Sequence, residues 1–178
     1  MPAVDAASFR IGFSTAWAAL VRRGALAAGE TLVVLGAAGG SGLTALQLGH
    51  ALGARVFAVG AGGERLEACR RLGAEVLIDR TSESLPEVVL QATDGKGADV
   101  IFDPVGGELA TAALQGLGSG GRFLAIGFAS GEWVKVDTHE LVWRNQSLVG
   151  VLAAGRTREE DEADHEALLA LAAEDKLL

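Results

Sequence analysis

The fold of this chain is decided by the stretch Thr31-Leu-Val-Val-Leu-Gly-Ala-Ala-Gly-Gly-Ser-Gly-Leu-Thr-Ala-Leu-Gln-Leu48. An apolar strand runs through a glycine-dense turn into an amphipathic helix, an order typical of a site for the pyrophosphate of a dinucleotide. Glycines let the backbone approach phosphate closely, and the helix directs free N–H groups and the positive end of its dipole at the anion. The usual G-x-G-x-x-G pattern is A-x-G-x-x-G here, because Ala37 stands in the first position.

A second apolar strand follows this helix directly, at residues 55–59. Residues 31–60 therefore make one complete βαβ unit of about the 30 residues expected for such a unit. A Walker-type phosphate loop is excluded, because no Gly-Lys-Ser or Gly-Lys-Thr closes the turn. A glycine-rich turn that binds no ligand stays open as the structural alternative.

Length and composition narrow the class of protein further. The 178 residues suffice for a sizeable core and suit a single domain over residues 1–178. The formal net charge of −8 argues against nucleic acid or an anionic membrane as the partner. One cysteine, Cys69, excludes an internal disulfide framework and a paired-cysteine zinc site. Neither a signal sequence nor an apolar run of membrane-spanning length is present, so we expect a cytoplasmic protein.

Strands and helices alternate along the rest of the chain. The apolar periodicity predicts strands at 31–35, 55–59, 75–78, 98–102, 121–126 and 147–152. It predicts helices at 6–23, 41–52, 63–72, 84–93, 107–116 and 157–174. This order predicts an α/β fold, a Rossmann-type doubly wound parallel sheet of about six strands with helices on both faces. The ligand crevice of such a sheet lies beyond the carboxyl ends of its strands.

Glycine recurs after the strands that would line this crevice. The segments that follow them are 36–42, 60–65, 103–107 and 127–130. Such recurrence favours close approach of the backbone to a ligand at several points. Each glycine after the first loop is explained as well by a turn or a helix cap.

The end of the second strand predicts which dinucleotide is bound. An NAD site usually places a carboxylate there to accept from the ribose 2′-hydroxyl, but this chain has Val59-Gly-Ala-Gly62. No carboxylate occurs until Glu64, and Arg65 follows it in the first turn of the next helix, which favours NADP(H). Alternatively, Arg65 is one more solvated cation on a helix that also carries Arg70 and Arg71.

The sequence offers no catalytic acid or base and no metal site. His50, His139 and His165 have neither metal-ligand nor triad spacing. Asp103 ends a predicted strand and could be considered a general base. We expect a structural role for it instead, because an aspartate before a proline readily accepts from nearby backbone N–H groups.

The glycine-rich loop alone is a weak sequence signal, but two further motifs follow it and make the combination more specific. They are Phe102-Asp-Pro-Val-Gly-Gly107 and Gly120-Gly-Arg-Phe-Leu-Ala-Ile-Gly-Phe-Ala-Ser-Gly131. In this order, nearly the whole chain resembles the NADPH-dependent quinone oxidoreductases, the zeta-crystallin-like, zinc-independent branch of the medium-chain dehydrogenase/reductases. The resemblance implies that the pyrophosphate contacts Ala38, Gly39, Gly40 and Ser41. The other cofactor contacts that it implies are Gly60 and Arg65 at the 2′-phosphate, Val105 and Gly106 near the adenosine, and Gly127, Phe128 and Thr15 near the nicotinamide half.

The resemblance also implies a function. Family members transfer hydride from NADPH to a quinone or an α,β-unsaturated carbonyl, and they carry a GroES-like catalytic domain, which we expect to be absent from this chain. A small-molecule electron acceptor is therefore expected as a partner only if a catalytic domain is present. The last strand implies a homodimer, because family members pair it across a two-fold axis. An enoyl reductase component acting on thioesters and a non-catalytic dinucleotide-binding module are the alternatives. One departure from the family is Arg80, which stands where many members have tyrosine.

Overall fold

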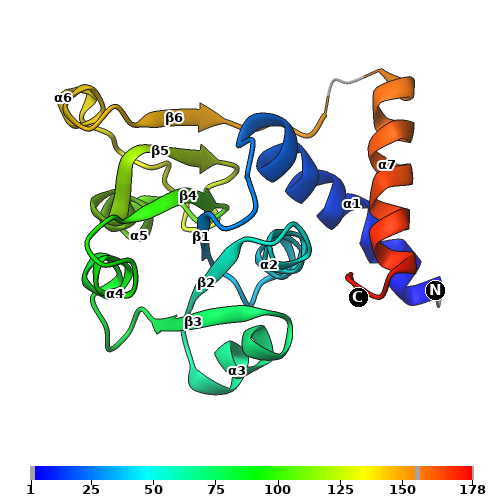
Figure 1. The fold of residues 1–178 in the computed structure, drawn as a ribbon, viewed down its shortest axis with the longest axis horizontal. Coiled ribbons are helices and arrows are strands. Elements are labelled where there is room, and N and C mark those ends of the chain that lie inside the picture. The colour runs from blue at the N-terminus through cyan, green and yellow to red at the C-terminus, as the bar shows by residue number, and fades with distance from the viewer. Residues whose placement is uncertain (1–2, 155–156, 178) are drawn as a thin grey trace.

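The computed structural model describes residues 3–154 and 157–177. One sheet holds β1 (Thr31–Leu35), β2 (Arg55–Gly60), β3 (Ala74–Asp79), β4 (Ala98–Asp103), β5 (Leu117–Ala125) and β6 (Ser147–Gly150). The strand order is β3-β2-β1-β4-β5-β6, and every pairing is parallel (Figure 1). The order reverses between β1 and β4, as in a Rossmann-type sheet, so the predicted fold is confirmed.

Helices connect these strands. They are α1 (Ala3–Trp17), α2 (Gly40–Ala51), α3 (Gly63–Arg71), α4 (Leu85–Ala92), α5 (Gly107–Ala113), α6 (Thr138–Trp143) and α7 (Arg158–Ala173). A π-helix, η1 (Ala18–Arg23), extends α1, and a 3-10 turn, η2 (Leu114–Gly116), extends α5. Within the described ranges, no helix has the length and apolar character that a membrane crossing requires.

Two hydrophobic cores cover the two faces of the sheet. On one face, Val34 and Phe102 join a core with α1, α2, α3 and α7. On the other, Val33 and Ile101 join a core with α4 and α5. Successive residues of a strand point to opposite faces, and the central strand β1 is buried throughout. The near-continuous apolar strands of the sequence are therefore explained by burial on both sides.

The structure differs from the sequence expectations mainly in four places, besides small shifts at other ends such as the last strand, which stops at Gly150 rather than at residue 152. The helix predicted at 6–23 changes from α to π geometry at Ala18, and the helix predicted at 107–116 ends in a 3-10 turn. Strand β5 begins at Leu117 rather than at residue 121, and the pairing register shifts between Ala98 and Val100. Helix α6 was not predicted, because its six residues include no buried one and give no periodic apolar face.

The C-terminal helix α7 packs on α1 at a distance from the sheet (Figure 1). The rings of Phe9 and His165 meet edge to face, with centroids 6.4 Å apart. Arg22 Nε donates to the buried carboxylate of Asp164 at 2.9 Å. These contacts fix α7 to the segment that leads into β1.

Candidate functional site

Four loops meet at the carboxyl edge of the sheet, because the parallel strands end level with one another. The register aligns Leu35 with Val59, and Asp103 with Ala125. Neighbouring strands lie about 4.8 Å apart, so the row from β2 through β1 and β4 to β5 spans about 14 Å. A doubly wound sheet binds a dinucleotide along this row, where the strand order reverses.

The loop between β1 and α2 is closed tightly by its own backbone. Gly36 has φ +61°, and its carbonyl accepts from Gly39 N at 2.9 Å. A Cβ atom on Gly42 would overlap the Gly36 carbonyl oxygen and would lie 2.7 Å from Ala37 Cα. Gly42 is therefore required by the contact between the helix and the strand, as the sequence pattern predicts for this position.

Helix α2 begins without a side-chain cap. Its N-cap residue, Gly39, offers no side-chain acceptor, so no side chain satisfies the N–H groups of the first turn. Gly40 and Ser41 are exposed, Ala38 is half-buried, and a Cβ atom on Gly40 would meet nothing within 4 Å. An uncapped, sterically open helix start suits a phosphate group, so these residues fit the pyrophosphate of a dinucleotide.

The ends of β2 and β3 carry the residues predicted to contact the adenosine 2′-phosphate. Gly60 is buried, and Arg65 is exposed in the first turn of α3. Arg80 N donates to the Gly60 carbonyl at 3.0 Å, which brings Arg80 beside this loop. Within the described residues, 3–154 and 157–177, neither Arg65 nor Arg80 forms an ion pair. The Arg65 guanidinium therefore remains available to an anion, whereas that of Arg80 interacts electrostatically with the neighbouring Asp79.

Asp79 places a carboxylate at the same end, which the order of residues along the chain did not reveal. The register pairs Asp79 with Gly60. Its Oδ1 atom accepts from Thr81 Oγ1 at 2.7 Å and from Thr81 N at 3.0 Å. These hydrogen bonds, the hydroxyl bond first, hold the pKa of Asp79 below its usual value. A negative charge thus lies beside Arg80 at the end of β2 and β3.

The turn between β4 and α5 depends on Asp103. Its Oδ1 atom accepts from Val105 N at 2.9 Å and from Gly106 N at 2.8 Å, which is the structural role predicted from the sequence. Oδ2 is buried and has no hydrogen-bond partner among the described residues. Burial raises the pKa of Asp103 and outweighs the two amide bonds, which lower it. Val105 contacts the loop between β1 and α2, residues 36–39, which we call the phosphate loop. A Cβ atom on Gly36 of this loop would lie 2.9 Å from Val105 Cγ2.

The segment after β5 is attached to that turn. Gly127 N donates to the Asp103 carbonyl at 3.2 Å, and Ser130 N donates to the Val105 carbonyl at 2.9 Å. A Cβ atom on Gly106 would overlap the carbonyl oxygen of Glu132, so this segment covers Gly106. Gly106 is accordingly buried, whereas Phe128 remains 50% exposed.

Thr15 differs from the other predicted residues because it lies on a helix rather than on a loop of the carboxyl edge. Its hydroxyl donates to the Ile11 carbonyl of α1 at 2.9 Å. Helix α1 crosses α2 closely at Gly12, where a Cβ atom would lie 3.4 Å from Thr44 Oγ1. The structure therefore connects Thr15 to the loop between β1 and α2 through the packing of α1 on α2.

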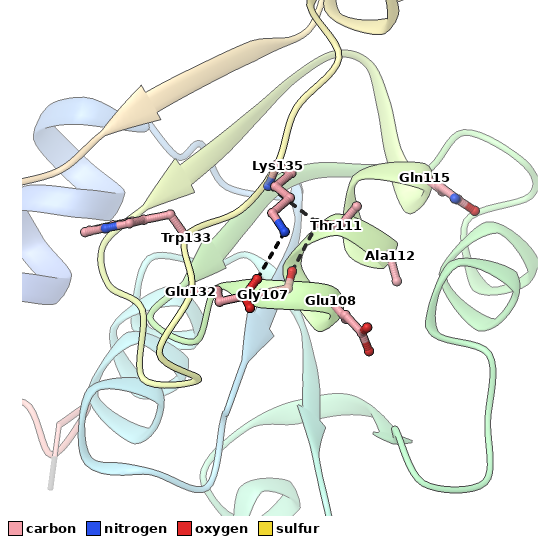
Figure 2. Close-up of a pocket in the computed structure, with 8 residues that line it drawn as sticks. All are labelled: Gly107, Glu108, Thr111, Ala112, Gln115, Glu132, Trp133 and Lys135. Atoms are coloured by element: carbon pink, nitrogen blue, oxygen red, sulfur yellow. Dashed lines mark hydrogen bonds and ion pairs between the residues drawn. The ribbon is translucent and has the colours of Figure 1, made fainter.

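A shallow groove that the sequence did not predict lies between α5 and the segment that leads to α6 (Figure 2). Its volume is about 330 Å³, and its lining includes Glu108, Thr111 and Gln115. Lys135 Nζ pairs with Glu132 at 3.1 Å across its mouth. Trp133 also lines the groove, and in Figure 2 its side chain points away from the pair of Lys135 and Glu132. The groove shares only Gly107 with the glycine-rich turns of the carboxyl edge.

Comparison with known proteins places the chain in a family. The family model described as "Zinc-binding dehydrogenase" matches residues 40–172. A quinone oxidoreductase-like protein 2 homolog of Nematostella vectensis is 36% identical over 149 residues, which are 83% of this chain and 40% of that protein. The chain spans between 6% and 45% of the length of the curated relatives it matches.

Solved structures show the same architecture. A 2-haloacrylate reductase superposes with a TM-score of 0.93 at 25% identity, over 99% of this chain and 56% of that one. A chain described as a candidate enoyl reductase domain of a polyketide synthase superposes with a TM-score of 0.78 at 28% identity, over 95% of both chains.

The family description mentions zinc, which requires a cluster of His, Cys, Asp or Glu side chains. The part of the chain that the structure describes holds no group of three or more His, Cys, Asp or Glu side chains able to bind a metal ion. The dinucleotide does fit, because the open start of α2 lies at the reversal of strand order. The chain therefore belongs to the zinc-binding dehydrogenase family, as a dinucleotide-binding domain of the quinone oxidoreductase-like kind.

Proposed function

We propose that this chain binds NADPH along its carboxyl edge and holds the nicotinamide for hydride transfer to a quinone or an α,β-unsaturated carbonyl. The observation that carries the proposal is the open start of α2, where the first-turn N–H groups lack a side-chain cap. Residues 38–41 would contact the pyrophosphate there. The adenosine half would extend toward Gly60, and the nicotinamide half toward Gly127 and Phe128, with Thr15 nearby on α1.

Each part of the edge has its own task in this proposal. When bound, the dinucleotide supplies the hydride, and water supplies the accompanying proton. The first-turn amides of α2 neutralise the pyrophosphate charge without a side chain. Asp103 fixes the turn that carries Val105, and the segment after β5 fixes Gly127 against Pro104. The chain thus acts by binding and orientation.

We also propose that the wall opposite the nicotinamide comes from outside these residues, in a GroES-like catalytic domain. The half-exposed Phe128 leaves that side of the edge open, and the chain spans 40% of the Nematostella relative. NADPH oxidation with menadione as acceptor tests this proposal. Efficient turnover by the 178-residue chain alone would contradict the need for a second wall. Enoyl reduction on a thioester is the second candidate, because one superposable chain is described in those terms.

The proposed preference for NADPH over NADH depends on two arginines that would attract the 2′-phosphate and one aspartate that would repel it. Arg65 and Arg80 flank Gly60, and each charged contact with a 2′-phosphate would contribute about 1.5–3 kcal/mol, which is about tenfold to a hundredfold in affinity. Asp79 opposes them, but its Oδ1 atom is engaged by Thr81. We therefore expect NADPH to bind more tightly than NADH.

Titration of both cofactors against charge variants tests this preference. Arg65→Glu and Arg80→Glu should each weaken NADPH binding about tenfold or more while changing NADH binding little. Arg71→Glu, at the far end of α3, is the matched control. Unchanged NADPH affinity in both variants would refute the preference. If Asp79→Asn were the one variant to change NADPH affinity, by raising it strongly, Asp79 rather than the arginines would determine the cofactor preference.

The homodimer through β6 is also proposed here. Strand β6 is an edge strand with every residue at least partly exposed, Leu148 being 43% exposed. Leu152, two residues beyond the strand, is 80% exposed. An unpaired apolar edge favours pairing with a second copy across a two-fold axis. Sedimentation at micromolar concentration should therefore show dimers that Leu148→Lys converts to monomers. A wild-type chain that is monomeric throughout would rule out this contact.

A further inference from the structure

Two half-exposed aromatic side chains lie together at the β5 end of the carboxyl edge. Phe128 is 50% exposed and Trp133 is 52% exposed. Their ring centroids are 4.6 Å apart, and the ring planes make an angle of 34°. We call these two residues the aromatic pair. A contact between two rings that leaves half of each exposed creates an apolar surface that the described residues do not cover.

The backbone beneath the aromatic pair is fixed at several points. Ala129 N donates to the Pro104 carbonyl at 3.2 Å, and Gly131 N donates to the Phe128 carbonyl at 2.8 Å. A Cβ atom on Gly106 would lie 3.2 Å from Phe128 Cα, and one on Gly107 would lie 2.7 Å from Ser130 Oγ. The two glycines thus let the segment lie directly on the turn after β4. A surface held this way is preorganised rather than formed on binding.

The position of the aromatic pair links it to the reacting end of the cofactor. The phosphate loop follows β1, the turn of Asp103 follows β4, and the aromatic pair follows β5, one strand further along the same edge. A dinucleotide with its pyrophosphate on α2 and its adenosine toward β2 directs its other half toward β5. The aromatic pair therefore lies where an electron acceptor must approach.

We infer that the aromatic pair is the surface on which a planar, ring-shaped acceptor stacks, so that Trp133 selects quinones over linear enoyl thioesters. This inference rests on the proposed function. Aromatic faces interact best with other flat π-systems in offset or edge-to-face contact. A linear acyl chain gains only apolar contact from the same surface, and leucine would supply that contact equally well.

Calorimetric titration of the 178-residue chain with menadione, in the presence and absence of NADP⁺, tests the inference without turnover. Trp133→Leu should weaken menadione binding about threefold to tenfold, the range expected for loss of an aromatic pair contact. Trp133→Phe should restore binding to within about twofold of wild type. A crotonyl thioester should bind wild type and Trp133→Leu equally. Trp143→Leu is the matched control, because Trp143 is 78% exposed on α6, away from the loops of the carboxyl edge.

The results separate this inference from the proposed function. Unchanged menadione affinity in Trp133→Leu, or an equal loss of the thioester, would overturn the inference. A parallel loss of NADP⁺ affinity would overturn it too, since the aromatic pair would then hold the cofactor. Failure of wild type to bind NADP⁺ would contradict the proposed function instead, while the titration without cofactor would still measure the contact of menadione with the aromatic pair.

Discussion

Replacing Gly42 with alanine should destabilise the fold and weaken cofactor binding together. The added Cβ atom would lie 2.7 Å from Ala37 Cα and 2.8 Å from the Gly36 carbonyl carbon, besides overlapping the Gly36 oxygen. All of these neighbours are backbone atoms, so no side-chain rotation relieves the contact. Because carbon atoms pack at about 3.5–4.0 Å, the start of α2 must move away from β1 by more than about half an ångström.

The size of the effect follows from two opposing terms. Overpacking costs about 1–3 kcal/mol, and the higher helix propensity of alanine returns up to about 1 kcal/mol. Because the neighbours are backbone atoms, we expect a net loss of about 2 kcal/mol in the free energy of unfolding. For a chain of this size, that loss lowers Tm by about 4–8 °C. NADPH affinity should fall about tenfold or more, since one charge-assisted contact is worth about 1.5–3 kcal/mol.

Gly40→Ala provides the comparison within the same helix. A Cβ atom there meets nothing within 4 Å, so the unfolding free energy should stay constant or rise by up to about 1 kcal/mol. Urea unfolding followed by circular dichroism measures stability, and NADPH fluorescence measures affinity. Equal stability of Gly42→Ala and wild type would refute the steric reasoning. An equal loss in both variants would show that any alanine at this helix start is harmful, whatever the space.

Three further changes test the electrostatics and the backbone. Burial raises the pKa of Asp103, so its contribution to stability is complete below its unfolded pKa and is lost as pH rises through the folded value. Asp103→Asn, which keeps an acceptor for both amides, should therefore remove the fall in urea stability that begins as pH rises above about 4, and an unchanged pH slope would contradict this. Burial tends to raise the pKa of Glu30, but the hydrogen bonds that it accepts from Arg122 and from Ala27 N lower the pKa overall. Glu30→Gln should therefore reduce the free energy of unfolding by about 1–2 kcal/mol at pH 7 and by progressively less below about pH 4.5. A reduction that does not change with pH would argue against the ion pair. Ala25 has φ +44°, so Ala25→Gly should raise the unfolding free energy by up to about 1.5 kcal/mol in the same assay, and a loss would show that the left-handed backbone is not strained.

The sequence predicted the sheet well because its strands are buried on both faces. Residues 31–35 and 98–102 are near-continuous apolar runs, and both appear as strands at those positions. Helix α6 escaped prediction for the opposite reason: it buries nothing, and its start depends on the side chain of Asp137, which accepts from His139 N. Short elements held by local hydrogen bonds leave no periodic pattern in the sequence.

The sequence predicted two levels of the candidate site, the residues within one turn and the four strand-end loops that the alternation of strands and helices brings to one edge. Residues 38–41 lie together because one turn contains them. Asp79 and Arg80 join Gly60 through the pairing of β3 with β2, which residue order alone does not express. No carboxylate lies between Val59 and Gly63, and this absence was the sequence argument for NADP(H). The argument is weaker than it looked, because Asp79 of β3 brings a carboxylate to the same end of the sheet.

The structure also divides the recurring glycines into two kinds. Gly42 and Gly106 are required by the protein's own backbone, because a Cβ atom at either position would overlap a carbonyl oxygen of the chain. Their presence would be explained even if no ligand bound. Gly40 and Gly63 face open space, and neither has a positive φ, so the fold gives no reason for a missing side chain at these two positions. A loss of NADPH affinity in Gly40→Ala or Gly63→Ala without a loss of stability would therefore be evidence for close approach of a ligand, which no effect at Gly42 can provide.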